Sequence, residues 1–383
     1  MNHASHTHSH RHHRFIESII EFVKKNIVLC IALFAAALTS VIVPPDSEYL
    51  SYFDFKTLTC LFCVLAVVCA LKNINFFYIL AREIVRRFKN IRLSVLALVY
   101  ITFIGSMLIA NDMALLTFLP LGYFVLSTTG NEKYMAFTFI MQNIAANLGG
   151  MLTPFGNPQN LYLYTKFNIP TGEFMSIMLL PFVLAIVLIT VCCLVFVKNE
   201  PLTVTGERTP LDRKKVIVYA LLFALSIAIV FRSIPYYIGL IVIPAVLIFM
   251  DRKALADVDY SLLLTFVAFF IFSGNVARID AVRNVFEVLL EKSTLLVSAL
   301  SCQVISNVPS AILLSNFTEN YPELLVGVNI GGAGTLIASL ASLITFKEYT
   351  KHNPGKAGSY IKTFSIFNFA FLGIMLAVML IVF

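Results

Sequence analysis

Asn147-Leu148-Gly149-Gly150-Met151-Leu152-Thr153 lies inside one long apolar segment, and Asn329-Ile330-Gly331-Gly332-Ala333-Gly334-Thr335 lies inside another. Both stretches read Asn-aliphatic-Gly-Gly-x-x-Thr. Glycine costs about 1 kcal/mol relative to alanine inside a helix, so the pattern predicts a break in each segment. A matched pair of breaks in the two halves of a membrane protein indicates the binding site of a transporter.

The composition supports a membrane location. The 383 residues are 59% apolar and 13% charged, and the mean hydropathy is +0.86. Soluble domains are about 45–50% apolar and about 25% charged. We therefore predict an all-α polytopic membrane protein that contacts the lipid bilayer. The net charge of +7 comes from basic residues in loops between apolar segments, which is typical of membrane topology and not of nucleic-acid binding.

Histidine and cysteine give no firm metal site. Residues 1–14 hold six of the seven histidines, which indicates either a tail without a set function or a loose metal-binding segment. The seven cysteines lie in apolar runs, and Cys60-x-x-Cys63 lacks a second Cys/His pair. We predict reduced thiols and no resident cofactor. Motifs of metalloproteases and phosphate-binding loops are also missing, so we predict that the protein is not an enzyme.

The order of apolar runs predicts two repeats of opposite orientation. The predicted divisions are a His-rich tail with a short amphipathic helix (1–26), a first transmembrane repeat (27–197), a cytoplasmic linker (198–215), a linking transmembrane helix (216–235) and a second, inverted repeat (236–383). Each repeat reads span, span, interfacial helix, re-entrant hairpin, unwound transmembrane helix, span. A hairpin returns to its own side, so one linking helix inverts the second repeat.

Charge sets the predicted orientation. A cytoplasmic N-terminus places 22 of the 28 Lys and Arg residues on the cytoplasmic side, as the positive-inside rule requires. We expect a multi-pass protein of the plasma (inner) membrane with its N-terminus in the cytoplasm.

The predicted site combines two hairpin tips with two unwound helices, of which the first should unwind over residues 148–160. Non-helical backbone at membrane depth is tolerated only inside protein or beside a water-filled cavity, so the four breaks should converge. The predicted substrate- and ion-binding residues are Asn111, Asp112, Asn147, Gly149, Gly150, Thr153, Asn157, Asn160, Ser306, Asn307, Pro309, Asn329, Gly331, Gly332, Thr335 and Ser339. Asn143 lies outside the breaks, and we expect it to make only interhelical hydrogen bonds.

Asp112 is the one acidic residue that we place within a membrane segment. Its carboxyl group could hold a proton or Na⁺, or it could cap the second helix of the hairpin. We expect coupling to H⁺ or Na⁺, with any Na⁺ near Asn111, Asp112 and Asn147. No other metal is predicted.

These residues resemble those of the ion transporter superfamily, and within it the ArsB/NhaD-type and citrate-transporter-like permeases. The matching stretches are Asn111-Asp112, residues 147–160, Asn307-Val308-Pro309 and residues 327–342. The resemblance implies two inverted repeats around a central site, a homodimer and elevator-like alternating access. Sodium-coupled dicarboxylate members carry Ser-Asn-Thr at both tips, whereas this chain has Ala110-Asn111-Asp112 and Ser306-Asn307-Val308.

We therefore predict a secondary active transporter for a small anion or ion. A Na⁺/H⁺ antiporter and an arsenite efflux permease are alternatives within the superfamily. An ion channel is the alternative from a different class, in which the breaks would form a selectivity filter.

Overall fold

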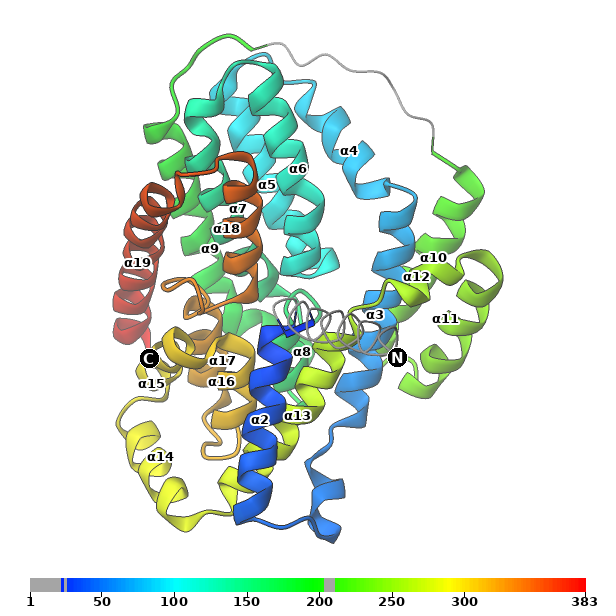
Figure 1. Cartoon of the computed structure of the whole chain (residues 1–383), viewed down its shortest axis with the longest axis vertical. Helices are drawn as coiled ribbons and strands as arrows, with labels where there is room; N and C mark the ends of the chain where they lie inside the picture. The colour runs from blue at the N-terminus through cyan, green and yellow to red at the C-terminus, as the bar shows by residue number, and fades with distance from the viewer. Residues whose placement is uncertain (1–21, 24–25, 203–210) are drawn as a thin grey trace, which may run out of the picture. The chain divides into compact units, whose positions relative to one another are not determined.

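The computed structural model describes residues 22–23, 26–202 and 211–383 (Figure 1). The predicted tail, most of the amphipathic helix before residue 27 and the middle of the predicted linker lie outside these ranges. The described residues are helical, apart from loops and one isolated β-bridge between Asn90 and Pro201. This confirms an all-helical fold. The described residues divide into two compact units, those within 1–54 and 259–283, and those within 55–258 and 284–383.

The first unit is built on two apolar helices. Helix α2 (Ile27–Ile42) packs on α13 (Tyr260–Ala277), and the 3₁₀ helix η1 (Ser47–Tyr52) also packs on α13. Polar pairs fasten the two helices along their length, because Ser261 Oγ donates to Asn26 Oδ1 and Asn275 Nδ2 donates to Thr39 Oγ1. In addition, the Arg278 guanidinium binds the Asp46 carboxylate at 2.7 Å.

The second unit contains the remaining helices. The first are α3 (Phe55–Asn73), α4 (Phe76–Val85), α5 (Ile91–Ile109), α6 (Asn111–Thr128), η2 (Glu132–Tyr134), α7 (Met135–Gly149), η3 (Gly150–Leu152), α8 (Pro158–Lys166) and α9 (Thr171–Phe196). After these come α10 (Arg213–Val230), α11 (Tyr236–Met250), α12 (Arg252–Ala256), α15 (Thr294–Ile305), α16 (Asn307–Leu314), α17 (Tyr321–Ile330), α18 (Leu340–His352) and α19 (Ala357–Val382). Helix α14 (Asp280–Lys292) begins in the first unit and ends in the second.

Among the described residues, five helical stretches are long and apolar enough to cross a membrane. They are Phe55–Asn73, Ile91–Ile109, Thr171–Phe196, Arg252–Ala277 and Ala357–Val382. The helices that open the two predicted repeats, α2 and α11, have 16 and 15 residues, which is shorter than the roughly 20 residues of a typical span. The structure thus supports a polytopic membrane protein.

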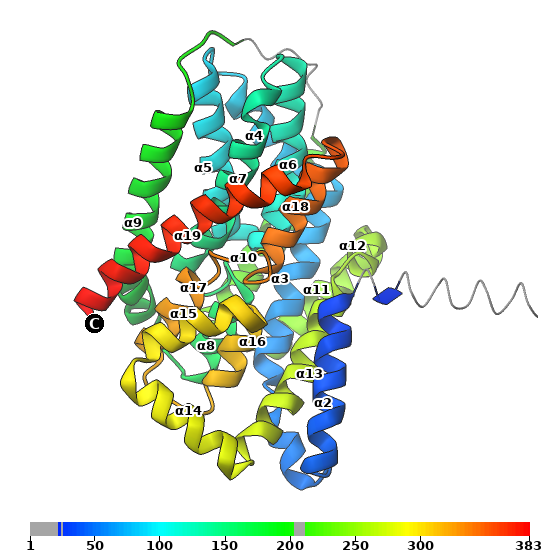
Figure 2. The ribbon, with the colours of Figure 1, turned by 60° about the vertical axis from the view of Figure 1, so that its left-hand side comes forward.

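Helix packing within the second unit repeats itself. Helix α5 packs on α6 and α7, and α15 packs on α16 and α17. Furthermore, α6 packs on α18, and α16 packs on α8. Helices α5 and α6 form the first hairpin, and α7 and α8 are the two halves of the first broken helix. Their counterparts are α15 and α16, and α17 and α18. Each hairpin therefore contacts the second half of the other broken helix. In Figure 1, α5, α6, α7 and α18 lie side by side, and Figure 2 shows α19 running obliquely across α7 and α18.

The compact units cut across the predicted repeats. Helix α2, which opens the predicted first repeat, packs on α13, which is the second helix of the predicted second repeat. Within the other unit, α11, which opens the predicted second repeat, packs on α3, which is the second helix of the predicted first repeat. In both cases, the opening helix of one predicted repeat contacts the second helix of the other. The repeat boundaries remain a prediction.

Candidate functional site

Both hairpin tips have the same unusual backbone. Ala110 has φ of 64° and ψ of 154°, and Ser306 has φ of 73° and ψ of 159°. Non-glycine residues at positive φ are uncommon and tend to mark functional sites. The following asparagine caps its own helix in each tip, because Asn111 Oδ1 accepts from Asp112 N and Asn307 Oδ1 accepts from Val308 N, both at 2.9 Å.

Both breaks attach to the adjacent hairpin in the same way. Thr153 Oγ1 donates to the carbonyl of Met107 at 2.9 Å, and Thr335 Oγ1 donates to the carbonyl of Gln303 at 3.1 Å. Met107 and Gln303 each lie four residues before the asparagine of their tip. We call residues 91–166 and 294–352 the first and second hairpin–break segments.

A glycine in each segment permits close helix contact. A Cβ added at Gly149 would lie 2.3 Å from the Phe103 carbonyl oxygen, and one at Gly331 would lie 2.9 Å from the Ala299 Cα. Phe103 and Ala299 each precede their tip asparagine by eight residues. The repeated motif therefore serves the same packing purpose in both segments.

The first break is narrower than the sequence predicts. The first runs from Gly150 to Asn157, including the single turn of η3, whereas we expected unwinding over 148–160. Pro158 occupies the first turn of α8, where a missing N–H is no disadvantage, so the helix resumes earlier. The second break separates α17 from α18 and includes Gly334 at φ of 124°.

The two broken helices are joined by crossed hydrogen bonds. Ser339 Oγ, just before α18, donates to Asn147 Oδ1 of α7 at 2.8 Å. Conversely, Asn157 Nδ2, just before α8, donates to Asn329 Oδ1 of α17 at 3.2 Å. In both contacts, the residue just before the second half of one broken helix donates to the motif asparagine of the other broken helix. All four side chains are at least 98% buried.

Further amides complete this cluster. Asn111 Nδ2 donates to Asn147 Oδ1 at 3.2 Å, so the first tip joins the network. Asn160 Nδ2 binds the carbonyls of Gly150, Met151 and Thr153, and Asn160 Oδ1 accepts from Asn329 Nδ2 at 2.6 Å. We call the side chains of Asn111, Asn147, Asn157, Gln159, Asn160, Asn329 and Ser339 the amide cluster.

The second tip reaches the cluster through its backbone. Asn307 N donates to the Ala338 carbonyl at 2.9 Å, and Ser306 Oγ donates to the same oxygen at 3.3 Å. A Cβ at Gly332 would lie 3.2 Å from Asn307 Nδ2 and 3.8 Å from Asn147 Cγ. Gly332 therefore lies next to the second tip and the first broken helix. Pro309 is buried in the first turn of α16.

Three polar atoms of the cluster have no hydrogen-bond partner among the described residues. They are Asn147 Nδ2, Asn157 Oδ1 and Gln159 Oε1. Buried polar groups in native proteins are normally paired with protein or with bound molecules, so unpaired atoms mark places where a ligand or water is expected. The predicted site residues are mostly buried here, while Asp112, Ser306 and Thr335 are half-buried.

Two glutamines were missed by the sequence analysis. Gln159 Nε2 donates to Asn329 Oδ1 at 3.4 Å. Gln303 Nε2 binds the carbonyls of Gly331 and Ala333, and Gln303 Oε1 accepts from Thr335 N. Glutamine is a good helix former and gives no break signal. Aligning the two hairpins on their tip asparagines places Gln303 opposite Met107, and that comparison could have drawn attention to it.

Asn143 behaves as expected for a structural residue, because its Nδ2 donates to Ser342 Oγ at 3.3 Å and links α7 to α18. Within the described ranges, no three His, Cys, Asp or Glu side chains gather as they would around a metal ion.

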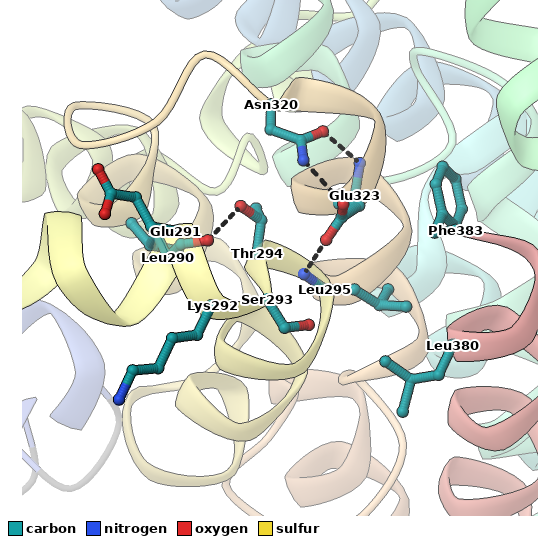
Figure 3. A pocket seen from close by; sticks show the side chains of 10 residues that line it. All are labelled: Leu290, Glu291, Lys292, Ser293, Thr294, Leu295, Asn320, Glu323, Leu380 and Phe383. Atoms are coloured by element: carbon teal, nitrogen blue, oxygen red, sulfur yellow. Dashed lines mark hydrogen bonds between the residues drawn. The ribbon is translucent and has the colours of Figure 1, made fainter.

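A separate pocket of about 270 Å³ lies where α14 meets α15, beside α17 and the end of α19 (Figure 3). Its polar groups serve helix ends, because Glu323 Oε2 accepts from Leu295 N and Asn320 Nδ2 donates to Glu323 Oε1. None of the predicted site residues lines this pocket, so we do not assign the substrate to it.

The fold and the buried polar cluster define a polytopic membrane protein of the transporter class. The chain belongs to the citrate transporter family, whose sequence pattern matches residues 16–322. It is 34% identical over 299 residues to the uncharacterized transporter MJ0456 of Methanocaldococcus jannaschii, covering 77% of this chain and 81% of that protein. It is also 30% identical over 302 residues to the inner membrane protein YbiR of Escherichia coli, covering 77% and 80%. These relationships confirm the resemblance drawn from the motifs, and they identify a membrane transporter.

Proposed function

We propose that this protein is a secondary active transporter that carries a small anion across the plasma membrane by alternating access, with H⁺ or Na⁺ as the coupling ion. The observation that supports this most is the crossed pairing of Asn147 with Ser339 and of Asn329 with Asn157. It joins both broken helices at one buried polar centre, where three polar atoms lack partners among the described residues.

The matching geometry of the two segments favours inverted repeats. The tips share their backbone angles and their asparagine caps, and the breaks share their threonine and glycine contacts. In a transporter with two inverted repeats, one repeat moves against the other, and the site between them opens to each side of the membrane in turn. We propose that both hairpins are re-entrant, that the N-terminus is cytoplasmic and that the protein works as a homodimer with an elevator-like motion.

The chemistry of the cluster supports a small anion as the substrate. Asparagine amides and helix N-termini can hold carboxylate or oxyanion groups without an arginine. The description of the family makes citrate the first compound to test. Asp112 occupies the position that Val308 takes in the second tip, and this difference supports our proposal that the coupling ion binds at the first tip. It also favours Na⁺/H⁺ exchange as a second candidate.

A substrate panel in proteoliposomes tests the proposal. Purified protein would be offered citrate, succinate, sulfate and arsenite under imposed H⁺ or Na⁺ gradients, and a pH dye would report Na⁺/H⁺ exchange. We expect saturable uptake of one class that depends on the counter-ion gradient. Unitary currents in a planar bilayer, without saturable coupled uptake, would instead support an ion channel.

A further inference from the structure

Gln159 is a buried glutamine in the first turn of α8, and neither the motif pattern nor the family assignment gives it a role. Its side chain is 1% exposed. Its Nε2 donates to Asn329 Oδ1 at 3.4 Å, and its Oε1 has no hydrogen-bond partner in the described part of the chain. Asn157 lies two residues earlier and is also 1% exposed. Its Oδ1 likewise has no hydrogen-bond partner among the described residues.

The orientation of these amides is fixed by backbone groups. Asn329 Nδ2 donates to the Leu325 carbonyl at 2.8 Å, so Asn329 must turn its oxygen toward Asn157 and Gln159. An amide oxygen can only accept hydrogen bonds. Asn157 and Gln159 must therefore present their nitrogens to Asn329, which leaves both of their oxygens as free acceptors. Asn157 Nδ2 also donates to the Asn147 carbonyl at 3.2 Å, which fixes that side chain a second time.

Asn147 differs from Asn157 and Gln159, because its unpaired group is a hydrogen-bond donor. Asn111 Oδ1 is occupied by Asp112 N, so Asn111 offers its nitrogen to Asn147. Asn147 Oδ1 faces that nitrogen and Ser339 Oγ, and Asn147 Nδ2 is left as a free donor. The amide cluster thus offers two acceptors and one donor.

This set of groups restricts the ligand. An ionised carboxylate oxygen cannot donate a hydrogen bond, so it suits Asn147 Nδ2 but not the oxygens of Asn157 and Gln159. A hydroxyl group can donate to an amide oxygen. An analogue that lacks the hydroxyl leaves the buried acceptor unpaired, so the site binds that analogue less tightly.

We infer that Gln159 Oε1 accepts a hydrogen bond from a hydroxyl group of the substrate, with Asn157 Oδ1 as the second unpaired acceptor beside Asn329, so that the transporter selects hydroxylated carboxylates over their deoxy analogues. This inference rests on the proposed function. Glycine is needed at position 150 next to this acceptor, because a Cβ there would lie 2.4 Å from Asn157 Oδ1.

The test compares two pairs of acids that differ by one hydroxyl: citrate with tricarballylate, and malate with succinate. Apparent affinities are measured by uptake competition in proteoliposomes. We expect the wild type to bind the hydroxylated member at least about tenfold more tightly, which is the effect of one buried hydrogen bond. Equal affinities in the wild type would overturn the inference without any variant.

Gln159→Met and Gln142→Leu give the matched comparison. Gln142 is also a buried glutamine whose Oε1 has no hydrogen-bond partner within the described ranges, but its Nε2 binds Thr102 Oγ1 and the Phe118 carbonyl, outside the amide cluster. We expect Gln159→Met to reduce the hydroxyl preference to less than about threefold by weakening only the hydroxylated acids, while Gln142→Leu keeps it. An unchanged hydroxyl preference in Gln159→Met would overturn the inference. A variant that loses affinity equally for both acids of a pair, and also loses the Na⁺ dependence of uptake, would overturn it too. Transport without any hydroxyl preference contradicts this inference alone, whereas no transport of any panel compound contradicts the proposed function.

Discussion

Nδ2 of Asn157 lies 3.2 Å from Oδ1 of Asn329, although the two residues are 172 positions apart in the sequence. Ser339 and Asn147, 192 positions apart, form the reciprocal contact at 2.8 Å. Each contact joins the residue that precedes the second half of one broken helix to an asparagine in the last turn of the first half of the other. The two breaks therefore depend on one another.

Replacing Gly149 with alanine tests the close approach of α7 to α5. The new Cβ would lie 2.3 Å from the Phe103 carbonyl oxygen and 2.6 Å from Ser106 Oγ. A backbone oxygen cannot give way easily, so we expect a loss of about 1–3 kcal/mol, visible as a lower Tm in detergent. Gly172→Ala is the control, since no atom lies within 4 Å of a Cβ there. Equal Tm values for the two variants would argue against the contact.

Gln303→Met tests how the second hairpin is attached to its break. The variant copies Met107 of the first hairpin and removes the partners of the Gly331 and Ala333 carbonyls and of Thr335 N. We expect about 2 kcal/mol of destabilisation and faster hydrogen exchange over residues 331–339, because buried groups lose their hydrogen bonds. Met107→Leu should change neither. Unchanged exchange in Gln303→Met would show that the glutamine does not hold this break.

Asp112→Asn tests the position of the coupling ion. We expect gradient-driven uptake to be abolished while counter-ion-independent exchange of substrate persists. Folding should be retained, because a half-buried carboxylate in the first turn of α6 contributes only about 0.3–1 kcal/mol through the helix dipole. Coupled uptake at the wild-type level in this variant would remove Asp112 from the mechanism. Asp280→Asn, in the first turn of α14, is the control.

Asp46 and Arg278 predict a pH dependence in the first compact unit. The hydrogen bond from Arg278 lowers the pKa of Asp46 below its ordinary value of 3.8. A carboxyl group whose pKa is lower in the folded state stabilises the fold above the ordinary value, and this contribution is lost as the pH falls through the folded pKa. Asp46→Asn should therefore lower the Tm at pH 7 but not at a pH below the folded pKa. A Tm difference that persists in strong acid would contradict this explanation.

Much of the site was predictable because its residues disfavour helix. Asn111-Asp112, Ser306-Asn307, the paired glycines and Pro158 all mark real interruptions of helices. The width of the first break was overestimated, because Pro158 begins a helix as readily as it ends one. The sequence could thus locate the breaks but not their ends.

Pairings across the chain were not predictable in the same way. Nothing local to Asn157 or Ser339 indicates which distant asparagine it binds, because that choice depends on how the broken helices pack. Gln159 and Gln303 were missed for a related reason, since a glutamine inside a helix is unremarkable until its neighbours are known. The division into compact units was also hidden, because α2 and α13 are far apart in the sequence.

The most direct test of the central claim is an electron cryomicroscopy map of the protein saturated with the panel compound that shows the highest uptake. We predict density for that compound within hydrogen-bond distance of Asn147 Nδ2 and of the side-chain oxygens of Asn157 and Gln159. Density in the pocket beside Glu323 instead, or no density next to the amide cluster at saturation, would contradict the account.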